Sequence, residues 1–189
     1  MKNEVSKIWI RFCCFPWEFG HNSWYPDWMK EQETPDLEVI SQLYHLELSH
    51  YFGLTQPNMF SPPPILVDYL HNCCTQQERF DALCEQVLFQ RSSYEMKSME
   101  CDWAFSFSKG LQSGLLVRAC PEPKIAMKHL TAYWFQTQFP DFWTQTRLLL
   151  PKELAESPLP STLYNYDRKI NLFFLSLISK VSTHHEYNR

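Results

Sequence analysis

Aromatic side chains are concentrated near the start of the chain. Residues 8–28 read IWIRFCCFPWEFGHNSWYPDW and contain four of the seven tryptophans, three phenylalanines and one tyrosine. Each such ring covers roughly 150–250 Å² when it is buried, so this segment needs a partner surface larger than one helix face. The sequence therefore predicts that the other elements pack around residues 1–33, which we call the aromatic strap.

The strap itself is predicted to be extended and then looped. Residues 8–13 alternate with the period of a short strand, while Pro16, Gly20 and Pro26 interrupt any long helix. A second apolar run at residues 147–151 is the candidate partner strand. Most strap aromatics are expected in the core, because aromatic side chains of a chain this long usually pack inward. The alternative is a protein interface, and its candidate partner-binding residues are Trp17, His21, Trp24 and Tyr25.

Segments with helical periodicity follow the strap. Thr34, Pro35 and Asp36 make a helix start, and Gly53 is placed to end that helix. Its predicted inward stripe consists of Leu37, Ile40, Tyr44, Leu48 and Tyr51. Proline-rich residues 56–64 predict a rigid connector to a short helix at 65–74.

The clearest apolar stripe follows a predicted capping box at residues 75–78, and it predicts the centre of the core. It consists of Phe80, Leu83, Cys84, Val87 and Leu88. A helix capped by Ser93 should come next, bent or interrupted at Gly110 and Gly114. Another helix is predicted from Pro123 to Phe139, and Ser161 is predicted to cap a final helix that runs through Val181.

These patterns predict a mainly α protein. The expected architecture is a single compact helical domain over residues 1–189, with at most a minor two-stranded element. It comprises the aromatic strap (1–33), a helical body (34–183) and a frayed tail (184–189).

Composition excludes several classes of function. A formal net charge of −4 lacks the basic excess that nucleic acid binding requires, and four glycines do not form a phosphate-binding loop. Seven cysteines, an odd number with two vicinal pairs, fit reduced thiols rather than a disulfide framework, and no zinc-ligand spacing occurs. Residues 1–12 lack the apolar run of a signal peptide, and no segment is long enough to cross a bilayer. A soluble protein without cofactor or metal is expected.

Catalysis has one candidate location in the sequence. Cys13, Cys14, His21 and Asp27 are the nearest polar constellation, but their spacing fits no catalytic motif. A small helical enzyme or small-molecule-binding protein that uses Cys13 and His21 therefore stays as the alternative to a non-enzymatic protein.

Two blocks of sequence resemble a known family. Arg11-Phe12-Cys13, followed by aromatic residues and His21, resembles the N-terminal segment of the sorting-platform adaptors of type III secretion systems (SctK). The second block is similar in order and spacing over most of the C-terminal half, and consists of residues 112–115 (QSGL), Trp143, residues 147–151 (RLLLP) and an amphipathic helix at 163–181. The middle, residues 56–108, matches only as a helical pattern.

The resemblance implies a non-enzymatic cytoplasmic adaptor at the inner-membrane face of the secretion apparatus, one that supports protein secretion. Its implied partners are the cytosolic forkhead-like domain of the inner-membrane ring protein and the pod protein of the sorting platform, near the ATPase spoke protein. The resemblance implies no nucleic acid partner and no insertion into the membrane.

Overall fold

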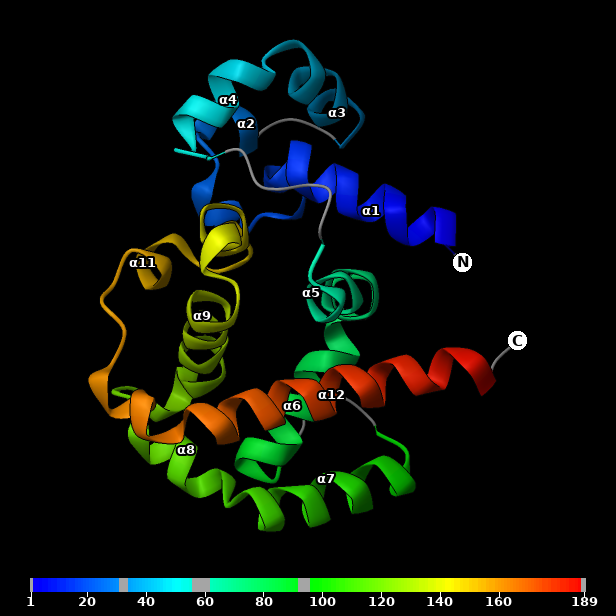
Figure 1. The fold of residues 1–189 in the computed structure, drawn as a ribbon, viewed down its shortest axis with the longest axis vertical. Coiled ribbons are helices and arrows are strands. Elements are labelled where there is room, and N and C mark those ends of the chain that lie inside the picture. Colours follow the sequence, from blue (N-terminus) through cyan, green and yellow to red (C-terminus); the bar gives the residue numbers. More distant parts are fainter. Residues whose placement is uncertain (1, 31–33, 56–61, 92–95, 188–189) are drawn as a thin grey trace. The chain divides into compact units, whose positions relative to one another are not determined.

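Helices make up the computed structural model of this chain (Figure 1). The structure describes residues 2–30, 34–55, 62–91 and 96–187; it is 80% helical, and the described residues contain no strand. The prediction of a mainly α protein is confirmed. None of the described helices is both long and apolar enough to span a bilayer.

The chain forms two compact units, and each is assembled from two stretches of sequence. Unit 1 consists of Met1–Pro63 and Phe135–Pro158, and unit 2 of Pro64–Trp134 and Leu159–Arg189.

Unit 1 is built from short helices. It contains α1 (Lys2–Cys14), η1 (Pro16–Phe19), η2 (Asn22–Trp24), α2 (Asp27–Lys30), α3 (Thr34–Leu43), α4 (His45–Tyr51), η5 (Pro140–Phe142), α10 (Trp143–Thr146), η6 (Arg147–Leu149) and α11 (Lys152–Ala155), where η denotes a single 3-10 turn. Prolines begin η1 and η5 because the first turn of a helix needs no backbone N–H donor there.

The strand predicted at residues 8–13 is wrong, because these residues belong to α1. Trp9, Phe12 and Cys13 are buried, at helical spacings of three and four, while Ile10 and Arg11 are exposed. Five of these six residues are apolar, so their alternation did not distinguish a strand from a helix. The predicted partner run forms η6, and no two-stranded element exists among the described residues.

The helix predicted over residues 34–53 exists but is split. Tyr44 leaves the helical conformation (φ −113°, ψ 29°) between α3 and α4, and Gly53 follows α4 with a positive φ of 58°. Of the predicted stripe, Leu48 is buried, whereas Tyr44 and Tyr51 are 53% and 55% exposed. The side chain of Leu37 and the connector at 56–61 lie outside the described residues.

Unit 2 is built around α6 and α12. Its elements are α5 (Pro64–Asp68), the π-type turn η3 (Tyr69–Cys73), α6 (Gln77–Phe89), α7 (Ser98–Leu111), α8 (Ser113–Ala119), η4 (Pro123–Ile125), η7 (Ser161–Tyr166) and α12 (Asp167–Tyr187). Helix α9 (Ala126–Gln138) belongs to unit 2 as far as Trp134. The stripe predicted for the core centre is confirmed, since all five of its residues are at most 5% exposed. Helix α12 packs on α5, η3 and α6, and Trp134 stacks on Phe174 with ring centres 4.6 Å apart.

The capping box predicted at residues 75–78 does not form. The Thr75 hydroxyl donates to the His71 carbonyl, and α6 begins after Gln76 without a side-chain cap. At the start of α7 half of such a box is present: Glu100 accepts from the Lys97 backbone N–H at 3.3 Å, and Arg79 donates to the same carboxylate at 2.6 Å. The predicted cap Ser93 lies outside the described residues.

Two further helix boundaries differ from the prediction. The chain breaks between α7 and α8 at Gln112, whose φ is 57°, and not at either neighbouring glycine. Ser161 begins the 3-10 turn η7, with no side-chain cap, and α12 starts only at Asp167. Helix α12 continues to Tyr187, since no glycine or proline ends the helix after Val181, and the frayed tail at 184–189 stays a prediction.

Candidate functional site

The two tryptophans proposed for partner binding lie in the core of unit 1. Trp17 is 1% exposed and Trp24 is 5% exposed, in a cluster with Met29, Leu48 and Phe52. Trp17 Nε1 donates to the Ser41 hydroxyl at 2.8 Å, and Trp24 Nε1 donates to the Leu150 carbonyl at 2.7 Å. Buried indole N–H groups need such acceptors. The prediction that these two side chains are exposed is therefore wrong.

His21 and Tyr25, the other two candidates, are half-buried and serve local structure. His21 Nδ1 accepts from the Ser23 backbone N–H at 3.2 Å and so caps η2. The Tyr25 hydroxyl donates to the Trp17 carbonyl at 2.6 Å. Burial, with a smaller contribution from Glu18, raises the pKa of Tyr25. Partner binding by either residue stays a prediction.

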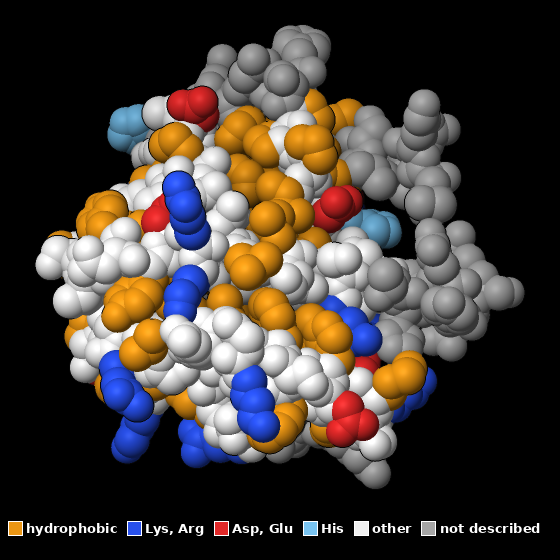
Figure 2. All heavy atoms as spheres, turned by 60° about the horizontal axis from the view of Figure 1, so that its bottom comes forward, with side chains coloured by type: hydrophobic (Ala, Val, Ile, Leu, Met, Phe, Trp, Pro, Cys, Tyr) orange, Lys and Arg blue, Asp and Glu red, His pale blue; other side chains and the backbone are white. Residues whose placement is uncertain are grey.

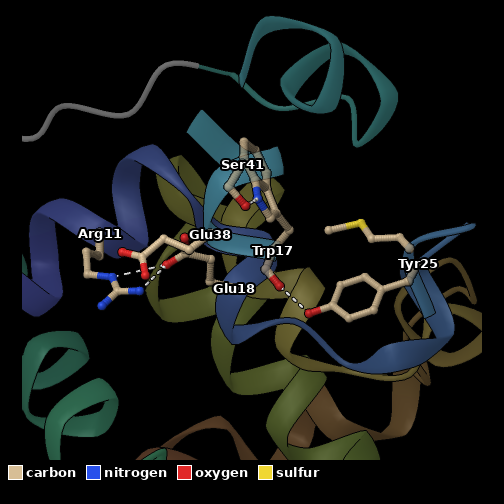
Figure 3. Close-up of a pocket in the computed structure, with 7 residues that line it drawn as sticks. Arg11, Trp17, Glu18, Tyr25, Glu38 and Ser41 are labelled. Carbon is tan, nitrogen blue, oxygen red and sulfur yellow. Dashed lines mark hydrogen bonds and ion pairs between the residues drawn. The ribbon is translucent and has the colours of Figure 1, made fainter. Parts of the chain in front are cut away.

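A small cavity lies beside these residues (Figure 3). It measures about 130 Å³ and is lined by Arg11, Trp17, Glu18, Tyr25, Met29, Glu38 and Ser41. Arg11 Nη2 donates to Glu18 Oε2 at 2.8 Å, and this hydrogen bond is the main reason that the Arg11 pKa is raised. Pockets for drug-sized ligands measure roughly 300–1,000 Å³, so this cavity is too small for one.

Cys13 lacks the environment of a catalytic thiol. Its side chain is 7% exposed, and burial raises its pKa to about 12. A thiol must ionise to act as a nucleophile, which requires an electropositive and partly exposed site. The described residues also contain no group of three or more His, Cys, Asp or Glu side chains that could hold a metal ion.

An apolar face on α3 and α4 is the strongest candidate site in unit 1. Val39, Leu43 and Leu46, which we call the α3–α4 face, are 56%, 71% and 78% exposed. Tyr51 on α4, and Tyr44 between the two helices, add half-exposed rings. Large apolar side chains gathered in this way are characteristic of a surface that another molecule covers.

The opposite side of the same helices fixes how this face is oriented. Ser41, which is completely buried, accepts the Trp17 hydrogen bond, and Leu48 is 3% exposed in the unit 1 core. His45 Nε2 lies 2.9 Å from the Cys14 carbonyl oxygen. These contacts hold one side of α3 and α4 on the strap and leave Val39, Leu43 and Leu46 pointing outward.

The surroundings of the α3–α4 face are acidic. Helices α3 and α4 contain three acidic residues, Asp36, Glu38 and Glu47, and no Lys or Arg. Unit 1 as a whole has 11 acidic and 6 basic residues, a formal charge of −5, whereas unit 2 has 10 and 11. A partner of this face would therefore be favoured by basic residues around an apolar centre.

The sequence contained a signal for this face that the helical prediction missed. Residues 39, 43 and 46 recur at spacings of four and three, so they form a second apolar stripe beside the predicted one. A surface helix usually buries only one apolar face, so a short helical segment with two apolar stripes leaves one of them exposed.

Comparison with known proteins adds no family to these observations: no family model, no curated protein and no solved structure matches the chain.

Proposed function

We propose that this protein is a non-enzymatic adaptor that binds partner proteins. The single observation behind this proposal is the α3–α4 face, where Leu43 and Leu46 are 71% and 78% exposed. Isolated exposed apolar residues are common, but three at helical spacing, with acidic residues beside them, favour a docking surface. The buried state of Cys13 gives the enzymatic alternative no support.

The resemblance of the sequence suggests which partners to test. On that basis the adaptor would belong to the sorting platform of a type III secretion system in the cytoplasm, at the inner-membrane face of the apparatus. It would link the cytosolic forkhead-like domain of the inner-membrane ring protein to the pod protein, and so support assembly and protein secretion. The strap residues His21 and Tyr25 are secondary candidates for the contact, because they are half-buried.

The test measures binding of the purified chain to the ring protein's cytosolic domain and to the pod protein. Leu43→Glu combined with Leu46→Glu should weaken one of these complexes roughly tenfold or more, because buried apolar anchors dominate interface energies. Phe105→Glu is the matched control, since Phe105 is also exposed (44%) but lies in unit 2. The melting temperature should change little in either variant.

Two outcomes would contradict the proposal at different levels. Binding of neither protein by the wild-type chain would remove the assignment to the sorting platform. If the double variant bound its partner as tightly as wild type, the α3–α4 face would not be part of the contact, and another surface would have to serve the adaptor function.

A further inference from the structure

Unit 2 has a shallow groove between α7 and α12. It measures about 430 Å³ and is lined by Trp103, Phe107, Leu175, Ser176, Ser179 and Lys180. The Trp103 and Phe107 rings stack with their centres 5.1 Å apart, and Lys180 Nζ lies 5.4 Å from the Trp103 ring centre. The lining thus combines two aromatic rings, one leucine, two hydroxyl groups and a cation.

Apolar side chains continue from the groove onto both helices. Met99, one turn before Trp103 on α7, is 68% exposed. Leu172, three residues before Leu175 on α12, is 51% exposed, and Leu175 is 39% exposed. Figure 2 turns the lower part of Figure 1 toward the viewer, and orange hydrophobic side chains there lie among blue Lys and Arg side chains. The groove and its two apolar borders form one surface suited to another apolar element.

The α12 border of the groove is basic. Residues 168–182 contain Arg168, Lys169 and Lys180 and no Asp or Glu. Lys169 Nζ donates to Gln112 Oε1 at 2.7 Å. Because Gln112 is neutral, this hydrogen bond does not neutralise the charge of Lys169. On α7 the exposed Asp102 is offset by the exposed Lys109. The formal charge of α12 between residues 168 and 182 is therefore positive, although the whole chain is acidic.

We propose that the α7–α12 groove binds an amphipathic helix of a partner protein, with apolar residues on one face and Asp or Glu residues beside them. Apolar side chains at spacings of three and four would lie against Trp103, Phe107 and Leu175, as in other helix-in-groove complexes. The acidic residues of the partner would lie beside Arg168, Lys169 and Lys180. This charge complementarity would favour acidic helices over basic ones and would speed their association. This surface lies in a different unit from the α3–α4 face and does not depend on the partners suggested above.

A protein helix fits this groove better than a nucleic acid or an anionic membrane does. Nucleic acid affinity comes mainly from many phosphate contacts. Here three cations border a strip whose centre consists of aromatic and leucine side chains.

The experiment selects peptides from a random 16-residue phage-displayed library on the full-length chain. Enriched peptides are then synthesised with a fluorophore and their dissociation constants measured by polarisation. We expect enriched sequences with a net negative charge and apolar residues at spacings of three and four. Ser179→Trp, which fills the groove, should weaken their binding roughly tenfold or more, and Lys180→Glu should weaken it too. Leu46→Asp, in unit 1, is the control and should leave binding unchanged.

Several results would overturn the proposal. These are a selection that enriches no binder, a set of enriched peptides that all bind Ser179→Trp as well as wild type, and peptides weakened by Ser179→Trp that are basic or lack helical periodicity. The chain is also tested with a thymidine oligonucleotide and with phosphatidylserine vesicles. If no peptide binds but one of these ligands does, and Ser179→Trp abolishes that binding, the groove binds another class of ligand and the proposal is wrong. If Ser179→Trp does not fold, as judged by its melting curve, Leu175→Asp at the exposed edge replaces it.

Discussion

At the scale of single residues, tertiary hydrogen bonds decide which tryptophans are structural. Trp17 and Trp24 lie in the unit 1 core because the Ser41 hydroxyl and the Leu150 carbonyl accept their indole N–H groups. Both acceptors come from parts of the chain that are distant in sequence. Trp28, from the same strap, stays 50% exposed.

Replacing a core tryptophan should therefore destabilise the protein much more than replacing an exposed one. We expect Trp24→Ala to lower the free energy of unfolding by about 3–5 kcal/mol, through lost burial and a lost hydrogen bond. Trp28→Ala, the matched control, should lower it by less than about 1 kcal/mol. Urea denaturation followed by circular dichroism measures both, and equal losses would contradict the burial of Trp24.

Asp81 on α6 should make stability depend on pH. Burial is the main cause of its raised pKa, Glu85 also raises it, and Gln77 and Lys128 oppose the shift. The folded chain thus binds this proton more tightly than the unfolded chain, so the stabilisation from Asp81 is present at low pH and is lost as pH rises through the folded-state pKa.

It follows that Asp81→Asn should raise the melting temperature at pH 7. The difference from wild type should shrink as pH falls toward the ordinary aspartate value of 3.8. Asp102→Asn, at an exposed position on α7, serves as the control. Thermal melts across this pH range provide the measurement. If the melting-temperature difference between Asp81→Asn and wild type grew as the pH fell, the expected direction of the pH dependence would be wrong.

At the scale of elements, the number of apolar stripes on a helix separates core helices from those with an outward apolar face. Helix α6 has one stripe, and all of it is buried. The α3–α4 segment has two stripes, and only part of one is buried, since Leu48 lies in the core while Leu43 and Leu46 are exposed. The first pattern serves packing, and the second leaves a surface available for a partner.

The stripe of α6 should dominate the stability of unit 2. Leu83 is completely buried, so Leu83→Ala should cost roughly 2–5 kcal/mol of unfolding free energy. Leu172→Ala removes the same atoms from a helix position that is 51% exposed and should cost less than about 1 kcal/mol. Chemical denaturation measures the free energy of unfolding of both variants. Equal losses in the two would contradict the burial of Leu83 on α6.

At the scale of the whole molecule, each unit depends on a late stretch of the chain. Unit 1 needs residues 135–158, which supply Leu148 to the core and the Leu150 carbonyl to Trp24. Unit 2 needs residues 159–189, because α12 supplies Ile170, Phe173, Phe174, Leu177, Ile178 and Val181, all at most 1% exposed. Neither unit corresponds to a continuous segment of sequence.

Removing residues 159–189 should therefore abolish cooperative unfolding of unit 2. We expect the truncated chain to lose much of its helical circular dichroism and the sharp chemical-shift dispersion of a packed core, because α12 fills that core. A chain ending after Thr183 keeps all the buried α12 side chains named above and is the control. A fragment 1–158 that keeps the helical signal of residues 64–134 and the chemical-shift dispersion of their core would contradict the assignment of α12 to the core of unit 2.

Local sequence patterns predicted those features that local forces control. The helical class and the buried stripe of α6 follow from periodicity, and the stop after α4 follows from the positive φ that Gly53 adopts without strain. The same local rules did not separate helix from strand at residues 8–13, nor did they place the break at Gln112.

Periodicity and composition alone establish that this chain is helical and has more apolar faces than one core requires. The tertiary structure decided which faces are buried: Ser41 and Leu48 lie against the strap, and Val39, Leu43 and Leu46 lie outside. It also decided that Trp17 and Trp24 belong to the core. The physical reason is that periodicity shows which side chains share a face, whereas burial depends on the surfaces and hydrogen-bond partners that distant segments bring to that face.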